Sequence, residues 1–125
     1  MARSQERSQR KVSGGRYHHI RTKKKYELAR FPANTKIDDK QRVKTIRMLG
    51  GSIKQSLLTA KEINVADKQG KSQKTELITV VENPANPNLV RRNILTKGAV
   101  VETKLGKVKV TSRPGQGASL SGVLV

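Results

Sequence analysis

The amino-acid sequence predicts an all-β fold: a small antiparallel β-barrel of about six strands, preceded by a basic N-terminal arm that is disordered in the free protein. The first observation is the distribution of Ile, Leu, Val and Met, which number four in residues 1–35 and 27 in residues 36–125. The second is that these residues form short β-branched runs about 8 to 12 residues apart, separated by Gly, Pro and Asn. We therefore predict a basic arm at residues 1–35 and a β-barrel domain at residues 36–125.

Two glycines mark the first expected hairpin. Residues 43–49 and 52–58 are strand-like runs on either side of Gly50 and Gly51. Glycine adopts a positive φ angle without steric cost, and tight hairpin turns require such angles. These two strands are therefore expected to pair antiparallel.

A four-residue turn separates the next two expected strands, residues 63–66 and 75–81. The turn begins at Asp67 and ends at Gly70, and Asp in first place with Gly in last place is the preferred chemistry of a type I turn. These strands are expected to form a second antiparallel pair.

Regular pairing is interrupted at residues 83–87. Pro84 and Pro87 cannot donate to a strand ladder, so this segment is expected to be a long loop or crossover. No helix is evident. The remaining expected strands are residues 93–96, 99–104, 107–112 and 119–125. Residues 107–110 alternate Lys and Val, which places the lysines and the valines on opposite faces.

A closed or nearly closed barrel is the favoured arrangement, because closure removes the edges that a small sheet would otherwise expose to aggregation. All three aromatic residues, Tyr17, Tyr26 and Phe31, lie in the arm. The barrel core is therefore expected to be purely aliphatic. The tyrosine rings are left free, and they could stack on unpaired bases.

The charge of the chain points to a polyanionic partner. Lys and Arg together number 27 against nine acidic residues, a formal net charge of +18. Such a charge repels itself on a small protein unless a partner neutralises it. Residues 1–30 alone hold ten Lys or Arg and two acidic residues. A segment this basic cannot offset its conformational entropy by burial, so we expect it to track a nucleic-acid backbone and to fold there.

Other function classes are disfavoured by what the sequence lacks. Without cysteine there is no disulfide and no Cys-type zinc site, and a cytosolic protein is the default expectation. We expect no membrane partner, because we find no secretory signal and no apolar run near the roughly 18 residues of a membrane helix. No zinc finger, basic zipper or helix-turn-helix is recognisable, and the strands carry no aromatic platform. Contacts should therefore be mostly to phosphate and sugar.

An enzyme is the rival class. His18 and His19 are adjacent, so in an extended chain they point apart and make a poor metal site. Asp38 and Asp39 could serve metal-assisted chemistry, as in a nuclease, but their polar, lysine-flanked stretch is more typical of a solvated loop. No Walker loop, dinucleotide fingerprint or serine elbow is present. We therefore predict no catalytic residue, no metal site and no cofactor.

An ordered set of motifs resembles one known family. The motifs are Ser13-Gly14-Gly15-Arg16, Lys24-Lys25-Tyr26-Glu27-Leu28, Thr35-Lys36-Ile37, Arg47 with Gly50-Gly51 and Lys54, and residues 79–86, 91–99, 102–103 and 110–116. Single pieces identify nothing, but the ordered set is highly specific. Over essentially the whole chain it is similar to the small-subunit ribosomal protein family S-eight-e of archaea and eukaryotes, most closely to an archaeal member.

The resemblance implies a structural constituent of the small ribosomal subunit that binds small-subunit ribosomal RNA through a basic extension and a β-barrel body, and so supports translation. It implies no catalytic activity and no required cofactor. The implied location is cytoplasmic, in the small subunit beside neighbouring ribosomal proteins. Outside the ribosome we expect a monomer.

The expected RNA-binding residues are cations, together with glycines, tyrosines and histidines of the arm. They are Arg7, Arg10, Lys11, Gly14, Gly15, Arg16, Tyr17, His18, His19, Arg21, Lys23, Lys24, Lys25, Tyr26, Arg30, Lys36, Arg47, Lys54, Arg91, Arg92, Lys97 and Arg113. The alternative function is a general nucleic-acid-binding or chromatin-like chaperone that coats DNA. A preference for duplex DNA over structured small-subunit RNA would favour that alternative.

Overall fold

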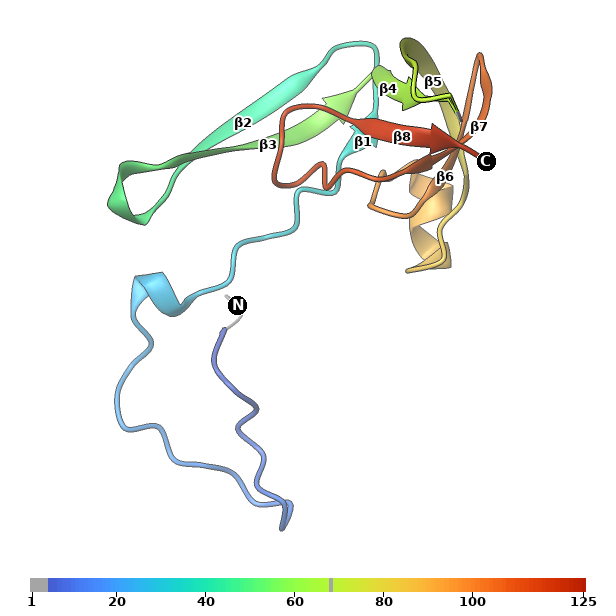
Figure 1. Ribbon diagram of the computed structural model, residues 1–125. Coiled ribbons are helices and arrows are strands. Elements are labelled where there is room, and N and C mark those ends of the chain that lie inside the picture. Colours follow the sequence, from blue (N-terminus) through green and yellow to red (C-terminus); the bar gives the residue numbers. More distant parts are fainter. Residues whose placement is uncertain (1–4, 68) are drawn as a thin grey trace. The chain divides into compact units, whose positions relative to one another are not determined.

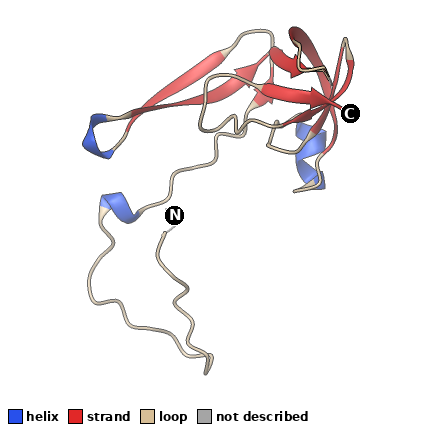
Figure 2. Ribbon diagram, in the orientation of Figure 1, coloured by secondary structure: helices blue, strands red, loops and turns tan. Residues whose placement is uncertain are grey.

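The computed structural model describes residues 5–67 and 69–125, and the chain divides into two compact units, Met1–Pro32 and Ala33–Val125. We call these the N-terminal unit and the C-terminal unit. Residues 1–4 of the predicted arm and Lys68 of the predicted turn lie outside the described residues. Strands dominate the regular structure, which confirms the all-β class (Figure 2). The strands are β1 (Lys36–Ile37), β2 (Arg42–Arg47), β3 (Ile53–Ala60), β4 (Glu62–Ala66), β5 (Ser72–Glu82), β6 (Val100–Thr103), β7 (Gly106–Val110) and β8 (Ser121–Leu124).

The predicted barrel is confirmed. Within the described residues, β4, β5, β6, β7 and β8 close into a five-stranded barrel (Figure 1). Successive strands pair antiparallel, as predicted, but the closing pair of β4 with β8 is parallel. The reason is geometric: in an up-and-down barrel with an odd number of strands, the first and last strands run in the same direction.

A glycine in β8 makes this closure possible. Gly122 lies opposite Val65 of β4 and Val110 of β7. A Cβ atom on Gly122 would lie 2.5 Å from Cγ1 of Val108 and 2.8 Å from the carbonyl oxygen of Lys109. Both distances are far below van der Waals contact, so a side chain at this position would push neighbouring strands apart.

The second sheet is three-stranded in the described residues, in the order β1-β3-β2. Strands β2 and β3 form the predicted antiparallel hairpin. Gly50 and Gly51 have φ angles of 78° and 87°, and the backbone N–H of Met48 donates to the carbonyl of Ser52 at 2.7 Å. Strand β2 ends at Arg47, two residues before the predicted end, because a 3-10 turn, η2 (Leu49–Gly51), occupies the tip.

The second predicted pair is also confirmed, since β4 and β5 pair antiparallel from Glu62 with Glu76 to Ala66 with Ser72. In the turn between them, the backbone N–H of Gly70 donates to the carbonyl of Asp67 at 2.9 Å.

The predicted strand at residues 93–96 is wrong. Asn93 adopts a left-handed conformation with a φ angle of 49°, and Ile94 forms only an isolated bridge with Lys36. Ile94 and Leu95 are buried, which explains the apolar run without a strand. Apolar residues that are buried at a bend therefore gave the same sequence pattern as a strand.

The prediction that helices are absent missed three short 3-10 helices in the described residues. Two of them, η1 (Lys25–Glu27) and η2, have three residues each, and the third is η3 (Pro87–Arg92). The side chain of Asn86 caps it by accepting a hydrogen bond from the backbone N–H of Asn88 at 3.0 Å. Pro87 occupies the first turn, where its missing N–H costs nothing. No helix in residues 5–67 and 69–125 has the length and apolar character needed to cross a membrane.

The core of the C-terminal unit is aliphatic, as predicted. Val101 and Val108 are fully buried, and Val108 and Val110 point inward while Lys107 and Lys109 are exposed, which confirms the predicted alternation. The base of the β2–β3 hairpin belongs to this core through Leu57. The clustered buried side chains are Leu57, Ala60, Ile63, Val65, Leu77, Val80, Leu95, Ala99, Val101, Val108, Val110 and Leu120.

Candidate nucleic-acid interface

All of the predicted RNA-binding residues are exposed. They fall into three groups: the N-terminal unit, the β2–β3 hairpin, and scattered positions of the C-terminal unit. In the last group, Arg91 and Arg92 form the last turn of η3 and Arg113 precedes β8. Lys36 lies in β1, and Lys97 lies between η3 and β6.

A tight bend organises the first cations of the N-terminal unit. Arg10 and Arg16 form an isolated antiparallel bridge, and the backbone N–H of Lys11 donates to the carbonyl of Gly15 at 2.8 Å. Gly14 turns the chain with a φ angle of 85°, a conformation that favours glycine. The side chain of Arg10 donates to the carbonyl of Gly14 at 2.9 Å. The bend therefore presents several cations on one short segment.

Tyr17 lies against two of these cations. The Arg7 guanidinium carbon is 4.5 Å and the Lys11 Nζ 5.4 Å from its ring centroid, which is cation–π geometry. By contrast, Tyr26 is 76% exposed. Tyr26 is therefore the more open of the two rings for stacking on a base.

The two histidines lie on the wall of a shallow hollow of about 400 Å³ in the N-terminal unit. Its lining residues are Glu6, Arg7, Ser8, Gln9, Tyr17, His18, His19, Ile20 and Arg21. The structure thus places His18 and His19 beside cations and a ring. In residues 5–67 and 69–125, no group of three or more His, Cys, Asp or Glu side chains is arranged to hold a metal ion.

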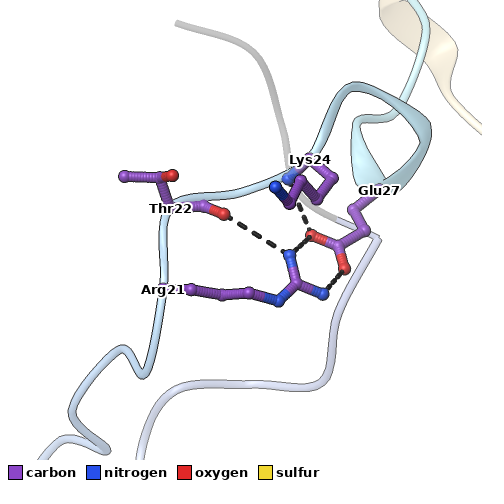
Figure 3. Close-up of polar contacts among 4 residues, drawn as sticks. All are labelled: Arg21, Thr22, Lys24 and Glu27. Atoms are coloured by element: carbon purple, nitrogen blue, oxygen red, sulfur yellow. Dashed lines mark hydrogen bonds and ion pairs between the residues drawn. The ribbon is translucent and has the colours of Figure 1, made fainter.

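An ion pair between Arg21 and Glu27 ties the other end of this unit together (Figure 3). The Arg21 guanidinium donates to both carboxylate oxygens, at 3.0 Å for the Nη1–Oε2 bond, and the backbone N–H of Lys24 donates to Oε2 at 2.9 Å. The hydrogen bond from Arg21, and then that from Lys24, lower the pKa of Glu27. The backbone N–H of Gln5 donates to the carbonyl of Glu27 at 3.0 Å, which closes the loop. The charge of Arg21 is thus already compensated within the chain.

A different set of cations is paired on the barrel. Lys74 pairs with Glu62, and Lys104 pairs with Glu76, whose pKa is lowered mainly by the hydrogen bond from Lys104. Lys61 bridges Glu76 at 3.9 Å and Asp39 at 3.7 Å. We call these residues of β4, β5 and β6 and their flanks the ion-paired face. Exposed pairs contribute little stability, but they cancel positive charge locally. None of these lysines is among the predicted RNA-binding residues.

The hairpin carries two exposed cations besides the predicted Arg47 and Lys54. They are Arg42 and Lys44 of β2. No acidic residue occurs between residues 42 and 60. Lys44 could have been selected from the sequence. A hairpin centred on Gly50 and Gly51 places Lys44 diagonal to Lys54 on one face of the ribbon.

Fold and surface together define a small, strongly basic β-barrel protein whose N-terminal unit and β2–β3 hairpin are both rich in cations. The chain matches the family described as Ribosomal protein S8e over residues 4–125. It belongs to this family, which confirms the resemblance seen in the sequence. The family is one of ribosomal structural proteins and not of enzymes.

Relatives match over nearly the whole length. The chain is 53% identical over 126 residues to small ribosomal subunit protein eS8 of Methanobrevibacter smithii, covering 100% of both chains. It is 51% identical over 122 residues to the eS8 protein of Methanocorpusculum labreanum, covering 97% of both. It is 47% identical to that of Nanoarchaeum equitans, covering 97% of this chain and 95% of the relative.

Proposed function

We propose that this protein is a structural constituent of the small ribosomal subunit that binds small-subunit ribosomal RNA in the cytoplasm and so supports translation. Membership of the S8e family supports the ribosomal assignment. The proposal assigns no catalytic residue and no cofactor. Neighbouring small-subunit proteins are its expected protein partners, and the free protein is expected to be a monomer.

RNA binding is supported by a difference between regions of the molecule. Some cations have carboxylate partners in the fold, and others lie in segments without acidic residues. On the ion-paired face, Lys61, Lys74 and Lys104 have carboxylate partners. The hairpin carries four cations and no acidic residue, and the bend at residues 10–16 carries three cations and none. Uncompensated cations that release counterions from phosphates supply most of the affinity in such complexes. Tyr26 adds an open ring for stacking, and Gly14 and Gly15 allow close approach of the backbone.

A competition experiment tests this function against the alternative of a DNA-coating chaperone. The full-length protein is bound to labelled small-subunit ribosomal RNA, and unlabelled RNA or duplex DNA of equal phosphate content is added. We expect the RNA to compete at least about tenfold better, and log K to fall with log salt by about 0.7 to 0.9 per phosphate contact. Preference for the duplex would favour the chaperone, and a salt-insensitive affinity would contradict phosphate binding.

A further inference from the structure

The β2–β3 hairpin extends away from the barrel (Figure 1). Its cations Lys44, Arg47 and Lys54 are exposed. Its base is anchored, since Leu57 is 1% and Ser56 5% exposed. The backbone N–H of Leu57 donates to the carbonyl of Pro114 at 2.8 Å, and the hydroxyl of Thr35 donates to the carbonyl of Leu57. Beyond Ser56 towards the tip, the strand is exposed. The hairpin is therefore anchored at its base, and most residues of its outer half are exposed.

The register of the ribbon distributes its side chains over two faces. Thr45 pairs with Gln55 and Arg47 with Ile53, so these four residues share one face, called here the Arg47 face. Residues directly opposite each other in an antiparallel pair lie on the same side of the sheet.

The alternate pairs define the other face. Lys44 pairs with Ser56 and Ile46 with Lys54, and we call this the Lys54 face. Each face thus carries cations, and the segment between residues 42 and 60 has no carboxylate to compensate them.

The tip exposes apolar side chains. Leu49 is 98% and Ile53 65% exposed. A two-stranded hairpin is at best marginally stable by itself in water, and uncovered aliphatic side chains add nothing to its stability. A ribbon with this composition is best accounted for by a partner that covers it.

We propose that this hairpin inserts between two segments of ribosomal RNA and contacts a different segment with each face. Lys44 and Lys54 neutralise phosphates of one segment, Arg47 those of the other, and Leu49 packs against a base or ribose at the tip. The proposal rests on the proposed function and deepens it. RNA fits better than a protein neighbour because every charged residue of the ribbon is a cation. Side chains cannot read the deep, narrow major groove of an A-form RNA helix. A ribbon is therefore expected to bind between RNA segments and not within one groove.

Directed cleavage tests the two-face arrangement, because the chain contains no cysteine. Single-cysteine variants Thr45→Cys, on the Arg47 face, and Ile46→Cys, on the Lys54 face, carry a tethered iron chelate that cleaves nearby RNA. Gln73→Cys on β5, paired with Val65 of β4, is the matched control. We expect the two hairpin probes to cut two RNA segments that are separate in sequence, and the control to cut neither.

Salt dependence supplies a second readout. Removing both lysines of the Lys54 face, K44Q with K54Q, should reduce the log–log salt slope by about 1.4 to 1.8, and R47Q by about 0.7 to 0.9. Lys74→Gln with Lys104→Gln removes the same charge from the ion-paired face and should leave the slope unchanged. Circular dichroism checks that each variant is folded.

The inference is overturned if both hairpin probes cut the same nucleotides, or if only one of them cuts RNA. It is also overturned if the hairpin probes cut no RNA and, in reconstituted subunits, cleave a neighbouring protein instead. Its failure is distinct from failure of the proposed function. If only the two-face arrangement is wrong, the wild-type protein still prefers small-subunit RNA in competition. If the proposed function is wrong, that preference is missing.

Discussion

The two units of this protein hold their shapes by different means. In the C-terminal unit, aliphatic side chains such as Val101 and Val108 are completely buried within a closed barrel. In the N-terminal unit, none of the described residues 5–32 is buried, and local turns depend on backbone hydrogen bonds, two cation–π contacts with Tyr17 and the ion pair between Arg21 and Glu27. The difference follows from aliphatic content, because only the C-terminal unit has enough aliphatic residues to form a core. We propose that the N-terminal unit depends on its partner for a fixed shape.

The ion-paired face and the β2–β3 hairpin differ in whether their cations have acidic partners nearby. The lysines of the ion-paired face find carboxylates on neighbouring strands, while Arg47 and Lys54 lie on a ribbon without acidic residues. Net charge alone does not separate these regions, since both contain lysines. We propose that compensation of charge within the fold separates a solvated surface from one that binds phosphate.

Deleting Met1 to Arg30 is the largest perturbation of this comparison. This change removes ten of the 27 Lys and Arg residues but no member of the aliphatic core. We expect the affinity for small-subunit RNA to fall at least about a hundredfold, with a shallower salt slope. The midpoint of thermal unfolding should be unchanged, as measured by circular dichroism. Unchanged affinity would place the binding energy in the C-terminal unit.

Substitution of Gly122 by Ala perturbs the barrel instead. The added methyl group overlaps Cγ1 of Val108 and the carbonyl of Lys109. We expect the free energy of unfolding to fall by about 1 to 3 kcal/mol, as is usual for overpacking, measured by urea denaturation. Gly117→Ala is the matched control, because a Cβ atom there meets nothing within 4 Å. Equal effects of the two substitutions would contradict the packing argument.

The smallest expected effect concerns the ion pair of the N-terminal unit. Because the pKa of Glu27 is lowered, the pair is intact above the ordinary glutamate range and is lost as the pH falls through the lowered pKa. Glu27→Gln should release Arg21 at neutral pH and steepen the salt slope of RNA binding by about 0.7 to 0.9.

Exposed Glu82 provides the control for that change, since Glu82→Gln alters the net charge equally and should leave the slope as it is. Nuclear magnetic resonance titration of Glu27 checks the pKa itself. A midpoint at or above the ordinary glutamate value would contradict the pairing.

Much of the fold could be predicted from local sequence signals. Gly50 with Gly51, and Asp67 with Gly70, located two hairpins because their conformational requirements are local. Strand β1 was missed because it has two residues and depends on parallel pairing with β3. The false strand at residues 93–96 arose because burial of Ile94 and Leu95 is a tertiary effect. The role of Gly122 was also invisible, since it depends on side chains from other strands.

The candidate interface could be predicted only in outline. Composition identified the basic N-terminal segment, but pairing of Arg21 with Glu27 depends on a turn that no periodicity reveals. Likewise, lysine content did not separate Lys44 from Lys74. The first lies on a ribbon without acidic residues, and the second lies beside Glu62 on the adjacent strand. Distinguishing these two lysines requires the strand register of the sheets, which the sequence alone does not give.

Amide hydrogen exchange of the full-length protein, followed by nuclear magnetic resonance with and without small-subunit RNA, tests the central claim most directly. The account predicts near-unprotected exchange for residues 5–32 in the free protein, strong protection of barrel amides such as those of Val101 and Val110, and new protection of residues 5–32 on RNA. Strong protection of residues 5–32 without RNA, or none with it, would contradict the account.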